Sequence, residues 1–367
     1  MKKYALNEIT FMQYIFLNFG MVTSVGFLSL PRVLAEQAGT AGWIALIIVW
    51  LISIAASLIV IQVMKRYPDG TLLDLITLYF GKWAGKVGAI LFAIYLIYYG
   101  YTGLVYTILI TKQYLLQQTP AYMIMLLLLI PTYVVVRNGP RILGRYVEVI
   151  IILSLWIPFV YLIPLKDAHW LNLLPMLQDG WKPVFSALPS TLYYHVGFST
   201  TFILYPFLKN KQKASAGIVI AYTLTMLMYL FITAICFVYF SQDAIMEYNE
   251  PTINVLKSIE FKFISRIEVL FIAFYLLIFS LSWIPTMYMS VFCTTWLIGK
   301  QDHRNHLRLL WLVIIVGTYF FMPTFFQSEQ MNTILGQIGF FIEYIVPFCL
   351  LLFVWIHDRL GWMKAKI

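Results

Sequence analysis

Long runs of apolar residues, separated by short polar segments, dominate this chain. Most runs are about 20 residues long, the length that a helix needs to cross roughly 30 Å of hydrocarbon. The runs, bounded by charges, proline and glycine, predict about ten spans. We place these spans at 8–36, 41–65, 84–117, 121–137, 141–164, 183–208, 214–240, 262–298, 306–327 and 334–357. The pattern predicts an all-α integral membrane protein.

Composition agrees with this pattern and leaves no room for a soluble domain. Of 367 residues, 61% are hydrophobic and 11% are charged, against about 25% charged residues in soluble domains. The longest loops, near 65–84, 164–183 and 240–262, are long enough only for short interfacial helices. The first run contains Pro31 and Arg32 and lacks a small-residue cleavage site, so we interpret it as a retained span. We predict one polytopic domain, 1–367, with repeat halves at about 1–164 and 183–357.

The charges predict the orientation of the chain in the membrane. The net charge is +9, and most of the 25 lysines and arginines fall in loops on one side of the predicted spans. The opposite side has only Arg32, Lys166, Lys182, Lys257, Lys262 and Arg266. Basic loops mark the cytoplasmic side, and an even number of spans places both ends of the chain there. We therefore expect a multi-pass protein with both termini in the cytoplasm.

Several classes of function find no support in the sequence. The basic residues form no contiguous stripe, which argues against a nucleic-acid partner. Cys236, Cys293 and Cys349 lie inside apolar runs without paired spacing, so we expect neither a disulfide framework nor a zinc site. The Gly-x-Ser-x-Gly elbow, the His-Glu-x-x-His helix and the phosphate-binding glycine loop are all missing. We predict no enzyme, no catalytic residue, no cofactor and no metal.

Two spans contain segments that favour interruption of the helix. Residues 18–31 (NFGMVTSVGFLSLP) and 189–201 (PSTLYYHVGFSTT) place glycine, hydroxyl and β-branched residues in mid-membrane. Lipid cannot satisfy free backbone groups, so interrupted helices occur only where protein or a water-filled cavity satisfies them. Paired interruptions in corresponding halves of a chain indicate a transporter-type site near the midplane. The alternative is that Gly26 and Gly197 only allow close helix packing.

Several short motifs resemble one family of membrane proteins. They are 20–31 with its Gly-Phe-Leu-Ser-Leu-Pro ending, Lys65-Arg66-Tyr67-Pro68, and 193–199 followed by Tyr205-Pro206. With the ten-span layout, the whole chain resembles the B subunit of bacterial spore nutrient germinant receptors, in the amino acid–polyamine–organocation superfamily. This resemblance implies the leucine-transporter fold, a five-plus-five inverted repeat with broken helices one and six. It also implies a role in sensing amino acids or sugars in the spore inner membrane.

The resemblance also implies which residues bind the ligand. In that fold, backbone groups at the two breaks meet the charged groups of the substrate, and spans three and eight complete the pocket. The corresponding positions are Thr23, Ser24, Val25, Gly26, Val196, Gly197, Phe198 and Ser199 at the breaks, with Tyr98, Thr102 and Thr286 beside them. Tyr98 is alternatively a core aromatic residue, and the two threonines alternatively bond back to their own helices. Some relatives of this fold bind sodium, but we predict none because no carboxylate lies near Ser280, Ser282 and Thr286.

Ionisable side chains inside the membrane are costly and are functional candidates by default. His195, Glu343 and Glu148 are candidates for proton binding or gating. His195 alternatively bonds a backbone carbonyl, and Glu148 alternatively pairs with Arg145 near the cytoplasmic end of its span. Glu343 lies nearer the middle of span ten.

The resulting hypothesis is a membrane-embedded subunit that binds a nutrient, most simply an amino acid, and triggers germination. Ligand binding would favour one arrangement of the two halves, and other receptor subunits in the same membrane would respond to it. Two alternatives remain open at this point. The chain is alternatively a proton-coupled amino-acid transporter, or an ion or water channel opened by a ligand.

Overall fold

The structure is a computed structural model that describes residues 8–178, 180–259, 267–299 and 304–359. Within these ranges, the side chains of Ser24, Val25, Ile267 and Asp358 are not described. Lys262 and Arg266, which the sequence assigned to the less basic side, lie outside the described residues.

Helices account for every predicted span. They are α1 (Phe11–Ala38), α2 (Gly42–Lys65), α4 (Lys82–Tyr114), α5 (Ala121–Val136), α6 and α7 (Pro140–Ser154, Ile157–Val160), α8 to α10 (Lys182–Ser186, Leu188–Tyr193, Thr201–Leu204), α11 (Ala214–Tyr239), α14 (Ile267–Ile298), α15 (Arg304–Phe320), and α16 and α17 (Phe325–Phe340, Val346–Arg359). In the described part of the chain, six helical segments are long and apolar enough to cross a membrane. The all-α membrane architecture is confirmed.

Short helices occupy the longer loops, as the sequence predicted. They are α3 (Leu72–Phe80), the 3-10 turns η3 (Ile163–Asp167) and η4 (Trp170–Leu173), α12 (Gln242–Met246) and α13 (Pro251–Lys257). Local sequence fixes several helix starts. Thr10 with Gln13, Thr71 with Asp74, and Thr324 with Gln327 form capping boxes, which satisfy N–H groups that a helix start leaves free.

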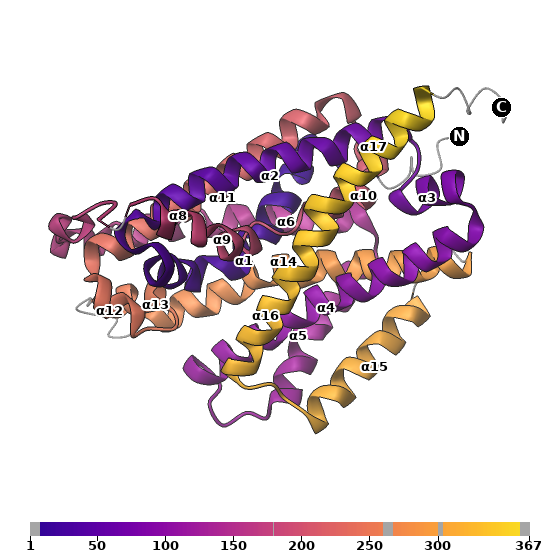
Figure 1. Ribbon diagram of the computed structural model, residues 1–367. Helices are drawn as coiled ribbons and strands as arrows, with labels where there is room; N and C mark the ends of the chain where they lie inside the picture. Colours follow the sequence, from indigo (N-terminus) through magenta and orange to yellow (C-terminus); the bar gives the residue numbers. More distant parts are fainter. Residues whose placement is uncertain (1–7, 179, 260–266, 300–303, 360–367) are drawn as a thin grey trace.

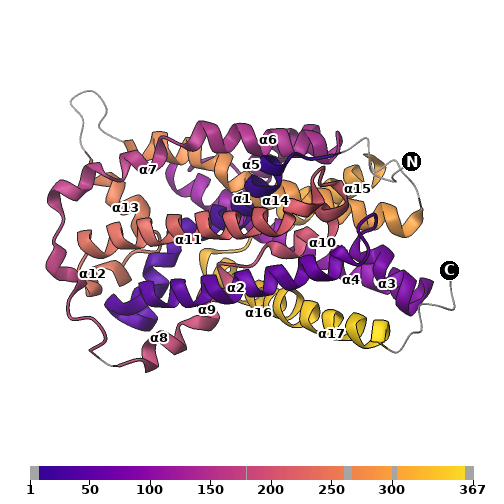
Figure 2. The same cartoon turned by 90° about the horizontal axis from the view of Figure 1, so that it is seen from above.

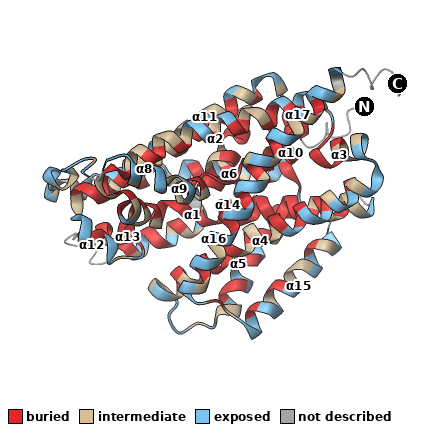
Figure 3. Ribbon diagram, in the orientation of Figure 1, coloured by how far each residue is buried: buried red, intermediate tan, exposed pale blue. Residues whose placement is uncertain are grey.

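The helices form an elongated bundle with different elements at its two ends (Figure 1). Both Figure 1 and Figure 2 place α8, α12 and α13 at one end and α3 with the end of α17 at the other. α1 packs against α11, α14 and α6, and α14 packs along α4. Figure 3 shows α1 and α14 as largely buried, whereas α15 alternates between buried and exposed positions. Exposed apolar side chains such as Leu309, Leu312 and Val316 suit a surface that faces lipid.

Candidate functional site

Span six is interrupted in the middle of the bundle. α9 ends at Tyr193 and the 3-10 turn η5 (Phe198–Thr200) follows, so residues 194–197 form no regular helix. Gly197 has a φ of +149°, a conformation that residues with side chains rarely adopt; glycine permits it because it has no Cβ. The interruption that the sequence predicted in span six is present. We call residues 194–197 the break.

Tyrosine hydroxyls satisfy three carbonyl groups of the break. The hydrogen bonds run from Tyr229 to the carbonyl of Tyr194 (3.2 Å), from Tyr222 to that of His195 (3.0 Å) and from Tyr99 to that of Val196 (3.2 Å). The donors come from α4 and α11, which flank the break on two sides. Since lipid offers no donors, these hydroxyls allow the helix to stay open at this depth.

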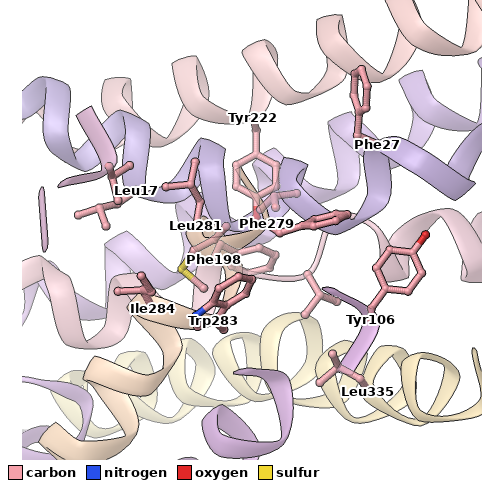
Figure 4. Packing of buried hydrophobic residues seen from close by; sticks show 14 of the residues in the cluster. Leu17, Phe27, Tyr106, Phe198, Tyr222, Phe279, Leu281, Trp283, Ile284 and Leu335 are labelled. Atoms are coloured by element: carbon pink, nitrogen blue, oxygen red, sulfur yellow. The ribbon is translucent and has the colours of Figure 1, made fainter. Parts of the chain in front are cut away.

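One carboxylate satisfies the N–H groups on the other side of the break. Glu343 accepts hydrogen bonds from the N–H groups of Gly197 (2.7 Å) and Phe198 (3.0 Å) and from the hydroxyls of Ser199 (2.6 Å) and Tyr95 (2.9 Å). Its own position is the π-helical turn η8 (Phe341–Ile345) between α16 and α17; such turns often occur at functional sites. Phe198 then packs edge-on against Tyr222, 5.8 Å between ring centres (Figure 4).

The same tyrosines connect the break to span one. Tyr229 donates a second hydrogen bond to the carbonyl of Val22 at 2.7 Å, and Tyr99 donates one to the carbonyl of Met21 at 3.3 Å. Each hydroxyl therefore lies between one carbonyl of α1 and one carbonyl of the break. The two segments that the sequence singled out lie side by side and share donors.

Span one differs from the expectation of a matching interruption. α1 runs as one helix from Phe11 to Ala38, through 23–26. Gly26 has no positive φ, and a Cβ there would lie 2.4 Å from the Tyr229 hydroxyl and 2.7 Å from the Tyr194 ring. Glycine at this position provides space for packing, the alternative that the sequence left open. The helix also continues through Pro31 to Ala38.

A small cavity lies where α1, α4, α16 and the break meet. We call it the inner cavity, and its volume is about 20 Å³, enough for about one water molecule. Its lining consists of Met21, Val22, Gly26, Tyr99, Thr102, Gly103, Tyr193, Tyr194, Val196, Asn332 and Leu335. This lining includes hydroxyl and amide groups but no charged side chain.

A larger cavity of about 750 Å³ lies beside the inner one, which we call the outer cavity. Tyr193, Tyr194 and Asn332 line both cavities, so they form the partition between them. Arg32 lies in the outer cavity and donates to Glu329 and to Asn249, at 2.7 Å each. Charged side chains therefore line the outer cavity, whereas none lines the inner cavity.

An acidic loop residue faces the outer cavity. Glu250 precedes α13, outside the spans, and is 3% exposed. Burial raises the pKa of its carboxyl from 4.5 to about 7, although a hydrogen bond from Tyr106 and the nearby Arg32 favour the charged form. The charge inside the outer cavity therefore changes close to neutral pH.

Comparisons with known proteins agree with this architecture. A family model described as spore germination protein matches residues 8–331. The chain belongs to the spore germination protein family. It is 21% identical to spore germination protein GerQB of Bacillus cereus, over 88% of each chain, and 23% identical to spore germination protein B2 of Bacillus subtilis (strain 168), over 98% and 97%.

A solved structure supports the same fold. The chain superimposes on the crystal structure of MhsT in complex with L-phenylalanine with a TM-score of 0.65 at 13% identity, covering 92% of this chain and 88% of that one. This likeness shows the leucine-transporter-type fold that the resemblance implied. Together with the apolar helices, it makes this member of the spore germination protein family a multi-pass membrane protein.

The predicted ligand residues of this family member do not all lie at one cavity. Gly26, Thr102 and Val196 line the inner cavity. Gly197, Phe198 and Ser199 bond Glu343 instead. The side chains of Ser24 and Val25 lie outside the described part of the chain.

The remaining predicted polar residues donate hydrogen bonds to backbone carbonyls. The Thr23 hydroxyl donates to the Phe19 carbonyl of its own helix, and the Thr286 hydroxyl donates to carbonyls of its own α14. Tyr98 donates to the carbonyl of Met331 on α16. None of the three lines the inner cavity.

Two of the candidate ionisable residues also lie away from the cavity lining. His195 is buried, and its Nδ1 lies 3.1 Å from the Thr191 carbonyl. Glu148 accepts a hydrogen bond from Gln13 of α1 at 3.1 Å. Neither residue lines the inner or the outer cavity. Glu343 is the candidate whose side chain bonds the backbone of the break.

Sequence reasoning missed the tyrosines and the contribution of α16. Tyr95 and Tyr99 are four apart, and Tyr222 and Tyr229 are seven apart, so each pair shares one face of its helix. That spacing is a usable signal, but 25 tyrosines in the chain dilute it. Asn332 gave no signal, because only the fold brings α16 to the break.

Proposed function

We propose that this chain is the nutrient-binding subunit of a spore germinant receptor and that its ligand is an amino acid. The ligand binds between α1 and the break, at the inner cavity, which must widen because it has room for about one water molecule. It enters from the outer cavity once Tyr193 and Tyr194 move aside. The likeness to spore germination proteins and to a transporter solved with L-phenylalanine supports this proposal.

The observation that carries the proposal is the set of backbone carbonyls around the inner cavity. Met21, Val22, Tyr194 and Val196 each present a carbonyl oxygen that Tyr99 or Tyr229 bonds. Carbonyl oxygens accept hydrogen bonds, so they suit a donor such as the ammonium group of an amino acid. A ligand that supplies those donors replaces the tyrosine hydroxyls and thereby changes how α1 and the break are joined.

In this proposal the basic loops face the cytoplasm, and the outer cavity opens on the opposite side of the spore inner membrane. Ligand binding shifts the relative positions of α1 and span six, and other receptor subunits in the same membrane respond to that shift. The chain has no catalytic role.

The test is reconstitution of the purified chain in vesicles with a panel of labelled amino acids and sugars. We expect saturable binding of at least one amino acid without accumulation inside the vesicle. Accumulation driven by a proton gradient would instead identify a proton-coupled transporter, and ion flux at saturating ligand would identify a channel. Gly26→Val should reduce binding at normal protein level, because its side chain fills the inner cavity. Gly317→Val is the matched control, since a Cβ at Gly317 meets nothing within 4 Å.

A further inference from the structure

Glu343 places a carboxyl group in the centre of the bundle. Its side chain is fully buried, and both oxygens are occupied by donors: two N–H groups on Oε2 and two hydroxyls on Oε1. An ionised carboxylate only accepts hydrogen bonds, so four donors match its charged form. Span ten thus places a carboxylate directly behind the break.

Hydrogen bonds do not neutralise this charge. Among the residues that the structure describes, no lysine, arginine or histidine forms an ion pair with Glu343. Glu36 and Glu329 of the outer cavity differ in this respect, because Arg32 pairs with both. A buried charge without a counter-charge is costly inside a membrane protein and suggests a cation that binds during function.

The carboxylate and the inner cavity share a wall. Val196 and Tyr99 line the cavity, while the adjacent Gly197 donates to Glu343. Tyr95, which also donates to Glu343, packs edge-on to Tyr99 with ring centres 6.4 Å apart. One layer of protein therefore separates Glu343 from the uncharged cavity, close enough for its charge to act on a bound cation.

We infer that Glu343 is the counter-charge for a protonated amine bound in the inner cavity, so that the ligand class is one that carries an ammonium group. This inference rests on the proposed location of the ligand. Glu343 does not touch the ligand: it is a positioning residue that fixes the direction of the break carbonyls and adds a negative charge behind them. Ligands that carry only a carboxylate are excluded by the same charge.

Glu343→Gln separates charge from hydrogen bonding. The amide oxygen of glutamine accepts from the N–H groups of Gly197 and Phe198, and its NH₂ group donates to the hydroxyls of Ser199 and Tyr95, which reverse their roles. The break keeps its partners but loses the charge. Tyr95→Phe is the complementary variant, because it removes one hydrogen bond and keeps the charge. Glu148→Gln removes a carboxylate that lines neither cavity.

The first measurement uses methylammonium, the smallest ammonium probe, and needs no identified nutrient. Thermal unfolding of the purified chain in methylammonium chloride is compared with unfolding in sodium chloride at equal ionic strength. We expect methylammonium to stabilise the wild type, Tyr95→Phe and Glu148→Gln, and not Glu343→Gln. Equal stabilisation of Glu343→Gln and wild type, or no stabilisation of the wild type, overturns the inference.

The second measurement uses an amino acid that binds, its methyl amide and its N-acetyl derivative, which carry zwitterionic, cationic and anionic charge. In the wild type the methyl amide should bind at least as well as the amino acid, and the N-acetyl derivative roughly tenfold more weakly or worse. Glu343→Gln should reduce that preference. An N-acetyl derivative that binds the wild type as well as the methyl amide overturns the inference and leaves the proposed function standing. A methylammonium effect that depends on Glu343, without binding of any amino acid, would support the charge role of Glu343 and contradict the proposed function.

Discussion

Spans one and six carry similar sequences and fold differently. Both place a glycine with serine and threonine in mid-membrane, yet α1 runs unbroken from Phe11 to Ala38, whereas span six opens at 194–197. The difference lies in what surrounds each segment. Span six has Glu343 to accept from its N–H groups and three tyrosines to donate to its carbonyls.

The described neighbours of α1 donate hydrogen bonds to its backbone but do not accept them at 23–26. Hydroxyls of Tyr99 and Tyr229 donate to two of its carbonyls, but in the described part of the chain no side chain accepts from the N–H groups of 23–26. Opening this helix would leave those N–H groups without a partner in a medium that has none. A low helix propensity therefore allows an interruption, but acceptors from neighbouring helices determine whether it forms.

The largest expected effect comes from removing the acceptor of span six. Glu343→Ala leaves the N–H groups of Gly197 and Phe198 and the hydroxyls of Ser199 and Tyr95 without this acceptor. We therefore expect a loss of about 4 kcal/mol in the free energy of unfolding. Glu148→Ala, which removes a carboxylate that Gln13 of α1 bonds at 3.1 Å, should cost about 1 kcal/mol. Reversible unfolding in mixed micelles measures both. Similar losses for the two variants would mean that Glu343 does not hold the break open.

Substitutions at Gly197 and Gly26 should have effects of intermediate size on stability. Gly197→Ala places a Cβ at a φ of +149° and 2.9 Å from Val22, so backbone strain and the close contact together should cost about 3 kcal/mol. Gly26→Ala keeps a helical backbone but displaces the Tyr229 hydroxyl and the Tyr194 ring, for about 1 to 2 kcal/mol. Gly317→Ala is the control and should be close to neutral. If Gly26→Ala were the costlier change, α1 rather than span six would hold the strained segment.

The same contrast explains how much of the fold and of the site could be predicted from the sequence. Span positions depend on runs of apolar residues within one stretch of chain, and every predicted span, from 8–36 to 334–357, coincides with helices. The short loop helices followed from loop length in the same way. These features are local, so the pattern of residues contains them.

The site depends on contacts between distant segments, and there the sequence was less informative. Val196 and Gly26 were predicted because their own segments look unusual, and both line the inner cavity. Asn332 and Tyr229 look ordinary in spans ten and seven, and only packing makes them part of the site. The continuity of α1 was unpredictable for the same reason, since it depends on the neighbouring helices, whose described side chains offer no acceptor opposite 23–26.

The smallest expected effect compares one hydroxyl in each span. Ser199 donates to the Glu343 carboxylate at 2.6 Å, so Ser199→Ala removes a charge-assisted hydrogen bond worth about 2 kcal/mol. The Thr23 hydroxyl donates to the Phe19 carbonyl at 2.8 Å, and that carbonyl lies within a continuous helix and keeps its backbone donor. Thr23→Val preserves the shape of the side chain and should cost about 0.5 kcal/mol or less. Unfolding in mixed micelles measures both variants, with hydrogen exchange at the amides of 23–26 as a second probe. A cost for Thr23→Val equal to that for Ser199→Ala, with faster exchange at those amides, would mean that α1 opens in solution and that its hydroxyl helps to close it.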